Sequence, residues 1–395
     1  MKLKISLFFF LFILNSSFFF GQNAGFADTV YFDDSKTVLR SVIQNQIDGD
    51  DTIRQGEASY YYDSGELWQT GFYEQDQMDS LWTTFYKSGQ VKREVIYVDG
   101  IRNGPFTNYY KNGKVKHLGQ HLNDSINGLM DFYDENGVLL EKRNYKNDQL
   151  NGILTGFYPS GKIHYKYNFV DSLKHGLYEK YYENGQIKEK ATIDDNSFSD
   201  EFLAYYENGN LKMSYKYKGQ EINGEYLVFY EDGKVMIKCN YLEGQRDGLW
   251  QEYHSSGNIF EEGMYKNGKR IGLWHTYYPN AEKYMIGQYQ NGLPNGIWDV
   301  YYENGFPKQK GSFLKGKSNG KWSFYHDNGQ LSMQGLFKDD LQEGRWIHYY
   351  ESGKVKLDLN YKLGKLEGIM TAYDEEGKII EQAEFVDNTL VRKIK

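Results

Sequence analysis

The sequence predicts an all-β protein of tandem 24-residue β-hairpins that form one elongated, twisted antiparallel sheet, an open ribbon or trough. A glycine recurs every 24 positions, with an aromatic residue four places before it, and no insertion or deletion occurs from 56 to 391. Aromatic residues make up 17% of the chain, 37 of them Tyr, and such residues favour strands. Only five prolines and no linker-like tract interrupt the chain, which favours one continuous architecture.

The recurring glycine predicts the hairpin turn. It is present in thirteen of fourteen units and is replaced only by Ala281. Asn, Ser or Asp precedes it in most units, which is typical of a tight turn with positive φ. A second aromatic series, eight residues after the glycine, fails only at His121 and Ile193. Each unit is therefore expected to be a hairpin, and a second turn leads to the next one.

Pairing across each turn predicts that large rings lie opposite glycines, which restores the packing that a glycine loses in a strand. The predicted pairs are Trp250–Gly263, Trp274–Gly287, Trp298–Gly311, Trp322–Gly335 and Phe106–Gly119. Trp82 opposite Val95 and Trp346 opposite Leu359 depart from this rule. Alternation places Trp298, Tyr302 and Phe313 on an apolar face and the Tyr301 series on a mixed face.

A lysine series supplies the candidate binding surface. The register set by Trp298 and Gly311 pairs Tyr301 with Lys308, and equivalent pairs recur along the chain. The candidate residues are Tyr181, Lys188, Tyr205, Lys212, Tyr301, Lys308, Tyr349 and Lys356. One interpretation is a structural contact between ring and ammonium group on a wet face. The other interpretation is a ladder, meaning a row of aromatic rings and lysine ammonium groups, that binds a glycan or an acidic peptide.

No catalytic, cofactor or metal site is expected. The single cysteine, Cys239, excludes an internal disulfide and a cysteine-based zinc site. His117 and His121 lie about 13 Å apart in a strand, too far to chelate one ion. Repeated, solvent-facing Glu residues lack the asymmetry that acid–base catalysis needs. A catalytic pocket would require an interruption of the repeat. Residues 193–200 are the candidate for such an interruption. The alternative is that the repeat sequence has simply diverged there.

The units GLWQEYHSSGNIFEEGMYKNGKRIG (248–272) and GIWDVYYENGFPKQKGSFLKGKSNG (296–320) resemble the bacterial variant of the MORN repeat. This resemblance covers about 56–391 and implies a β-hairpin scaffold or binding surface. Eukaryotic relatives are associated with membrane phospholipid and protein assembly, and bacterial arrays are often labelled antitoxin-like. The acidic net charge of this chain does not fit binding to membrane phospholipid. An export signal does not fit an antitoxin, which would act in the cytoplasm.

The expected organisation is a signal peptide at 1–21, a capping hairpin at 22–55, fourteen MORN-like repeats at 56–391 and the end of a closing strand at 392–395. Residues 1–21 combine Lys2 and Lys4 with a short apolar run and a small residue at the cut, and a retained anchor is the alternative. Export to the periplasm, cell surface or medium follows.

Cleavage would leave 44 basic and 54 acidic side chains, a net charge of −10, which disfavours duplex nucleic acid as a partner. The predicted function is a non-enzymatic exported scaffold for protein or cell-envelope interaction, glycan included. The alternatives are an antitoxin-like or immunity protein that binds a toxin and an anionic-lipid binder at a membrane surface.

Overall fold

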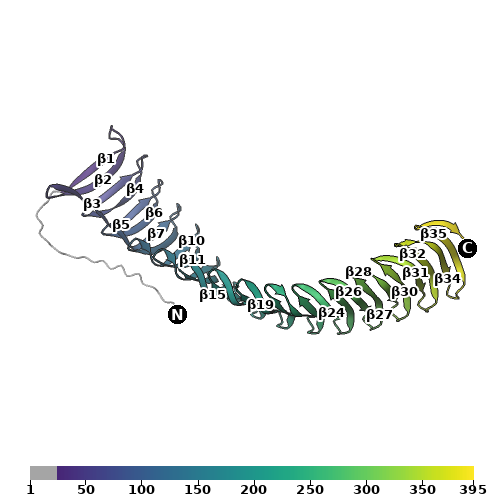
Figure 1. Ribbon diagram of the computed structural model, residues 1–395. Coiled ribbons are helices and arrows are strands. Elements are labelled where there is room, and N and C mark those ends of the chain that lie inside the picture. The colour runs from purple at the N-terminus through teal and green to yellow at the C-terminus, as the bar shows by residue number, and fades with distance from the viewer. Residues whose placement is uncertain (1–24) are drawn as a thin grey trace. The chain divides into compact units, whose positions relative to one another are not determined.

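The computed structural model describes residues 25–395, so the predicted signal peptide and residues 22–24 lie outside the described part. Within residues 25–395 all regular secondary structure is β, in 36 strands. No helix in this part is long and apolar enough to cross a membrane. The described chain divides into two compact units, residues 25–149 and 150–395. Within each unit the strands follow one another in chain order (Figure 1).

The first unit holds eleven complete strands. They are β1 (Phe26–Tyr31), β2 (Leu39–Asp48), β3 (Asp51–Tyr61), β4 (Leu67–Glu74), β5 (Gln77–Phe85), β6 (Val91–Val98), β7 (Ile101–Tyr109), β8 (Val115–Leu122), β9 (Ser125–Ile126), β10 (Gly128–Tyr133) and β11 (Leu139–Lys146). The short β12 (Gln149–Leu150) falls at the division.

The second unit continues the same alternation of strands and turns. Its strands are β13 (Gly152–Phe157), β14 (Ile163–Val170), β15 (Leu173–Tyr181), β16 (Ile187–Asp194), β17 (Ser197–Tyr205), β18 (Leu211–Lys218), β19 (Glu221–Phe229), β20 (Val235–Leu242), β21 (Gln245–Arg246), β22 (Gly248–Tyr253), β23 (Ile259–Lys266), β24 (Lys269–Tyr277), β25 (Lys283–Gln290), β26 (Leu293–Tyr301), β27 (Pro307–Leu314), β28 (Lys317–Ser318), β29 (Gly320–Tyr325), β30 (Leu331–Lys338), β31 (Leu341–Tyr349), β32 (Val355–Lys362), β33 (Lys365–Leu366), β34 (Gly368–Tyr373), β35 (Ile379–Val386) and β36 (Thr389–Lys393).

The strands pair antiparallel in both units, most with their neighbours in sequence, as β26 does with β25 and β27. Where a two-residue strand intervenes, the longer strands on either side of it also pair, as β8 does with β10 and β20 with β22. Among the pairings within residues 25–395, none joins the first strand of a unit to its last, so neither sheet closes. The predicted fold class, an open antiparallel sheet of tandem hairpins, is confirmed.

The hairpin turn contains a β-bulge that the sequence analysis missed. The Tyr302 N–H donates to the Phe306 carbonyl at 2.8 Å, and the Gly305 N–H donates to the Tyr302 carbonyl at 3.0 Å. Gly305 has φ +85°, as the predicted turn chemistry requires. Because the register shifts between Val300 and Tyr301, Tyr301 pairs with Pro307. The predicted pairing of Tyr301 with Lys308 is therefore wrong.

The predicted pairs of rings and glycines are confirmed, including Trp298 with Gly311 and Trp322 with Gly335. Trp274, Trp298 and Trp322, however, lie over a different glycine, whereas Phe106 lies over its own partner Gly119. A methyl group added at Gly335 would overlap the indole of Trp346, which belongs to the following hairpin. The same holds for Gly71 with Trp82, Gly263 with Trp274, Gly287 with Trp298 and Gly311 with Trp322.

This arrangement explains both departures from the expected rule. Trp82 and Trp346 pair with Val95 and Leu359 inside their own hairpins but cover glycines of the hairpins before them. Both indoles are almost fully buried, at 2% and 0% exposure. Size compensation therefore acts between consecutive repeats, so it joins one hairpin to the next.

A tyrosine series adds a second link between repeats. The Tyr302 hydroxyl donates to the Tyr325 carbonyl at 2.9 Å, and the His254 and His326 Nε2 atoms bond the corresponding carbonyls at 3.1 and 3.2 Å. The other members of this series are Tyr62, Tyr86, Tyr110, Tyr158, Tyr182, Tyr206, Tyr230, Tyr278 and Tyr350. Both histidines thus keep the structural position that tyrosine has in the other members of the series.

Candidate interaction surface

The lysine series lies over a different tyrosine from the one predicted. Lys308 Nζ lies 5.5 Å from the ring centroid of Tyr302, the residue after Tyr301. The corresponding pairs, at 5.3 to 5.8 Å, are Lys92–Tyr86, Lys116–Tyr110, Lys188–Tyr182, Lys212–Tyr206 and Lys356–Tyr350. These rings also carry the hydroxyl links between repeats. The rings of the ladder therefore help to hold neighbouring repeats together. In the sequence, the second tyrosine of the Tyr-Tyr pairs indicated their positions.

The predicted tyrosines are not the rings that their lysines approach, because each directly precedes the contacted ring in sequence. Tyr181 pairs with Ile187, and its hydroxyl donates to the Glu179 carboxylate at 2.6 Å. Burial and this carboxylate raise the pKa of Tyr181 to about 12. Lys166 Nζ lies 5.4 Å from the ring centroid of Tyr181.

The other predicted tyrosines have the same kind of polar surroundings. The Tyr349 hydroxyl accepts from Gln334 Nε2 at 2.6 Å, and Lys310 Nζ lies 5.9 Å from the Tyr301 ring. Burial raises the pKa of Tyr205, which pairs with Leu211. The structure thus does not bring the predicted tyrosines and lysines together, because each lysine lies over the tyrosine that follows the predicted one. We call the side with Tyr181, Tyr205, Tyr301 and Tyr349 the tyrosine face.

The tyrosine face of the second unit also carries an exposed aliphatic column. Leu249, Leu273 and Ile297 are 45%, 47% and 52% exposed, and each lies four residues before a tyrosine of this face. Residues four apart in a strand point to the same side, and equivalent residues of adjacent hairpins lie about 10 Å apart. Exposed aliphatic residues at equivalent positions elsewhere are Leu81, Leu129, Ile153, Leu177 and Ile369. Sequence reasoning missed this column, although the residue before each tryptophan was its signal.

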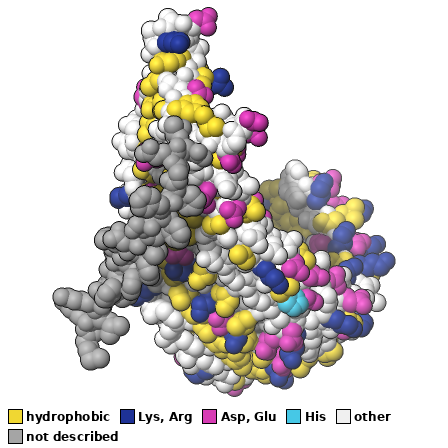
Figure 2. Space-filling model, turned by 90° about the vertical axis from the view of Figure 1, so that its left-hand side faces the viewer, with side chains coloured by type: hydrophobic (Ala, Val, Ile, Leu, Met, Phe, Trp, Pro, Cys, Tyr) yellow, Lys and Arg dark blue, Asp and Glu magenta, His cyan; other side chains and the backbone are white. Residues whose placement is uncertain are grey.

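On the face that Figure 2 shows, the described charged side chains do not form a block of one sign. Lys and Arg side chains are interspersed there with Asp and Glu, and hydrophobic side chains lie between them. Several opposite charges pair directly, such as Arg345 with Asp358 at 2.8 Å. A mixed surface of this kind does not offer the basic patch that a polyanion needs.

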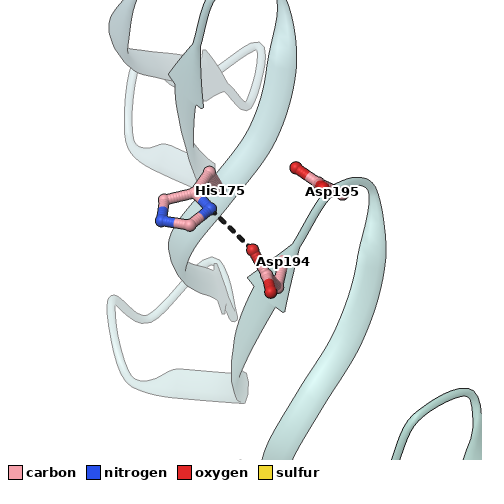
Figure 3. Close-up of side chains that lie close together, drawn as sticks. All are labelled: His175, Asp194 and Asp195. Atoms are coloured by element: carbon pink, nitrogen blue, oxygen red, sulfur yellow. Dashed lines mark ion pairs between the residues drawn. The ribbon is translucent and has the colours of Figure 1, made fainter.

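His175, Asp194 and Asp195 approach one another on β15 and β16 and the turn after them (Figure 3). The His175 Nδ1 and Asp194 Oδ1 atoms are 2.9 Å apart, and all three residues are exposed. An exposed pair of this kind contributes little to stability, and nothing else in the described part of the chain points to an ion there.

Residues 193–200, the predicted place for a break in the repeat, contribute to the core. Ile193 is 5% exposed and packs in a cluster with Tyr178 and Ala191, against which Phe198 lies. Asp200 has φ +63° at a position where most repeats have glycine. The segment thus keeps its packing despite the altered sequence.

Comparison with known proteins gives one family. The model described as "MORN repeat variant" matches eleven segments at the 24-residue spacing, which together cover more than half of the chain. They are residues 54–75, 78–99, 102–123, 126–147, 150–171, 174–195, 222–243, 246–267, 318–339, 342–363 and 366–387. The three units without a match, which include Ala281 and Asp200, still fold as hairpins.

Other comparisons give no functional information. No curated protein matches the chain. Similar solved structures include the Photorhabdus luminescens Tc holotoxin pore, at 12% identity and a TM-score of 0.15, with 94% of this chain and 20% of that chain covered. The TcdB2-TccC3 crystal structure has 12% identity and a TM-score of 0.16, with 92% and 23% covered. This chain therefore spans about a fifth of the length of these proteins.

Proposed function

The chain belongs to the MORN repeat variant family, and on that premise we propose that it is a non-enzymatic, exported scaffold that binds a protein of the cell envelope. Repeats of this kind present a broad surface on which equivalent side chains recur, and such surfaces suit extended partners. The family alone supports binding, whereas the choice of a protein partner rests on the composition of the tyrosine face.

The observation that carries the proposal is the column of Leu249, Leu273 and Ile297 beside Tyr253, Tyr277 and Tyr301. Exposed aliphatic groups gain free energy when a partner covers them, at about 25 cal/mol per Å². Tyrosine supplies an apolar ring together with a polar hydroxyl, which is why it is enriched at protein interfaces. An anionic membrane would instead favour a cluster of basic residues.

The test uses the chain from residue 22 and a variant with Leu249→Lys, Leu273→Lys and Ile297→Lys. Because these side chains are about half exposed, the variant is expected to keep its thermal stability. A matched control carries Leu242→Lys, Leu293→Lys and Leu314→Lys, whose side chains are 47%, 52% and 51% exposed at strand ends. Affinity capture from the native cell envelope is then compared for the three proteins.

We expect the unchanged chain and the control to capture the same protein and the triple variant to recover at most about a tenth of it, a loss of about 1.4 kcal/mol. Equal recovery by the triple variant would remove the proposal. Salt-sensitive binding to anionic liposomes that the lysines strengthen would favour the lipid alternative, and capture of a toxin would favour the immunity alternative. Export is tested separately, by sequencing the N-terminus of the protein recovered from outside the cytoplasm.

A further inference from the structure

A pocket of about 270 Å³ opens in the first unit, around two histidines that interrupt the repeat. Its polar lining comprises Arg93, Arg102, Asn108, His117, His121, Asp124 and Asp148, and its apolar lining comprises Phe106, Ile126 and Met130. It lies outside the tyrosine face of the second unit, so its role is independent of the proposed scaffold function.

The pocket exists because His121 replaces the aromatic residue of the second series. In three other repeats an arginine lies over that ring: Arg54 over Tyr73 at 4.2 Å, and Arg246 over Tyr265 and Arg270 over Tyr289, both at 5.4 Å. The smaller imidazole of His121 packs against Phe106, with ring centroids 4.4 Å apart and the ring planes inclined by 40°. The missing phenol leaves space beside the guanidinium of Arg102.

Two polar groups at this pocket lack partners. His121 is only 4% exposed, and its Nδ1 atom has no hydrogen-bond partner among the described residues. The Arg93 Nε atom is also buried without a partner in this part of the chain. Buried polar groups are nearly always hydrogen-bonded, so two unsatisfied atoms beside one cavity point to a ligand that bonds them.

The remaining charges of the pocket are already engaged. Arg102 Nε bonds Asp124 Oδ1 at 3.0 Å, and Arg102 Nη2 donates to the Asp124 carbonyl at 2.9 Å. The exposed Asp148 accepts the Ile126 N–H at 2.7 Å. Burial and the positive charges of Arg102 and Arg93 lower the pKa of His121, which favours its neutral imidazole. Arg93 is thus the one cation of the pocket lining without an anionic partner in the described structure.

We propose that this pocket binds a small carboxylate, with its oxygen atoms at Arg93 and His121 and its apolar part against Phe106 and Met130. A guanidinium N–H and a neutral imidazole N–H both donate to a carboxylate. A monoanion is favoured over a phosphate dianion, because Asp124 and Asp148 also line the pocket and only one cation is unpaired. The carboxylate belongs to a free acid or to an acidic side chain of a polypeptide.

The experiment titrates the chain from residue 22 with propionate and with propionamide, its neutral isostere, and follows the histidine ring signals by NMR. Propionate is expected to shift the His121 signals saturably, whereas propionamide is not. Two capped tripeptides, with Glu or Gln in the centre, distinguish the polypeptide source from the free acid. Inorganic phosphate tests the preference for a monoanion.

Variants locate the binding. Arg93→Gln and His121→Phe are each expected to raise the dissociation constant for propionate at least about tenfold, since each removes a hydrogen bond to a charged group. Arg345→Gln, in the second unit, is the matched control and is expected to leave it unchanged. Binding to Arg93→Gln is followed by the NMR signals of His117 and His121. Binding to His121→Phe is followed by the NMR signal of His117 and by the rise in melting temperature that propionate causes.

Three results would overturn the proposal. One is the absence of a saturable effect of propionate on the unchanged chain, and another is equal binding of propionamide or tighter binding of phosphate. The third is unchanged propionate affinity in Arg93→Gln. Should Arg93→Gln fail to fold, His121→Phe decides instead, because neighbouring repeats already hold an aromatic residue at that position.

Discussion

At the scale of single residues, the backbone conformation of the turn explains the glycine series. Ala281 occupies the turn position with φ +69° and keeps both turn hydrogen bonds, from the Ala281 N–H to the Tyr278 carbonyl at 2.9 Å and from the Tyr278 N–H to the Glu282 carbonyl at 2.8 Å. A residue with a Cβ atom is strained in this left-handed region, whereas glycine is not. The repeat therefore tolerates an alanine here at a cost in stability.

We expect Ala281→Gly to raise the free energy of unfolding by about 1 kcal/mol, because it removes that strain. Gly305→Ala is the matched control in the next repeat, where φ is +85° and no atom lies within 4 Å of the added methyl group. It should lower stability by a similar amount. Urea denaturation measures both, and a destabilised Ala281→Gly would contradict the interpretation.

The partly buried His117 and the buried His121 predict a dependence of stability on pH. Burial lowers the pKa of His117 and of His121, so below the usual histidine pKa of about 6.5 the unfolded chain binds more protons than the folded chain. Stability contributed by these residues is present above that pH and is lost as the pH falls toward the folded-state values.

Urea denaturation at pH 7 and pH 5 should show a smaller loss of stability for His121→Phe than for the unchanged chain. His275→Phe, an alteration at a histidine of the second unit, controls for the general effect of removing an imidazole. Equal losses in all three proteins would show that His121 does not carry the dependence.

At the scale of the hairpin, one repeat is held to the next by rings over glycines and by tyrosine hydroxyls on carbonyls. Trp346 is 0% exposed, although it belongs to a single layer of strands. Its indole lies over Gly335, and Phe337 packs against it with ring centroids 4.9 Å apart. Because both neighbours lie in the preceding hairpin, each hairpin needs its neighbour to bury its largest side chain.

Gly335→Ala should therefore lower the free energy of unfolding by about 2 kcal/mol, since the added methyl group overlaps the Trp346 ring. The double variant with Trp346→Leu should show a smaller penalty for the alanine than the single variant shows. Additive effects of the two changes in a double-mutant cycle would refute this link between repeats.

The hydroxyl links give a second prediction at this scale. Tyr302→Phe removes the bond to the Tyr325 carbonyl and should cost about 1 kcal/mol. Tyr301→Phe is the adjacent control, for which a smaller effect is expected because its ring contacts Lys310 on the mixed face. Chemical denaturation compares them, and an equal or larger loss for Tyr301→Phe would argue against the link.

At the scale of the whole chain, stability is collective, because the linked hairpins pack chiefly against their sequence neighbours. The terminal strands have a neighbour on one side only. All five residues of β36 are exposed, as are five of the six residues of β1. The predicted capping of residues 22–55 and closing of the array near 389–395 stay proposals.

The rate of amide hydrogen exchange should be higher in strands with a neighbour on one side only than in strands with neighbours on both sides. Amides of β36 and β1 are expected to exchange fastest, and those of β29 and β31, which hold Trp322 and Trp346, slowest, since end strands open at little cost in free energy. Mass spectrometry of the exchanging chain measures this order. Uniform protection along the chain would indicate a cooperative unit larger than the single repeat.

The sequence alone determined the hairpin period, the turn positions, the pairs Trp298–Gly311 and Trp322–Gly335, and the family. These features follow from local rules, since φ at a turn and alternation in a strand depend on residues close in sequence. The tertiary structure decided which groups meet within and between hairpins: Lys308 with Tyr302 and not Tyr301, the indole of Trp346 with Gly335, and the residues around the pocket at His121. Each of these contacts depends on how the side chains of one repeat and of adjoining repeats pack against one another. The period of the sequence does not specify that packing.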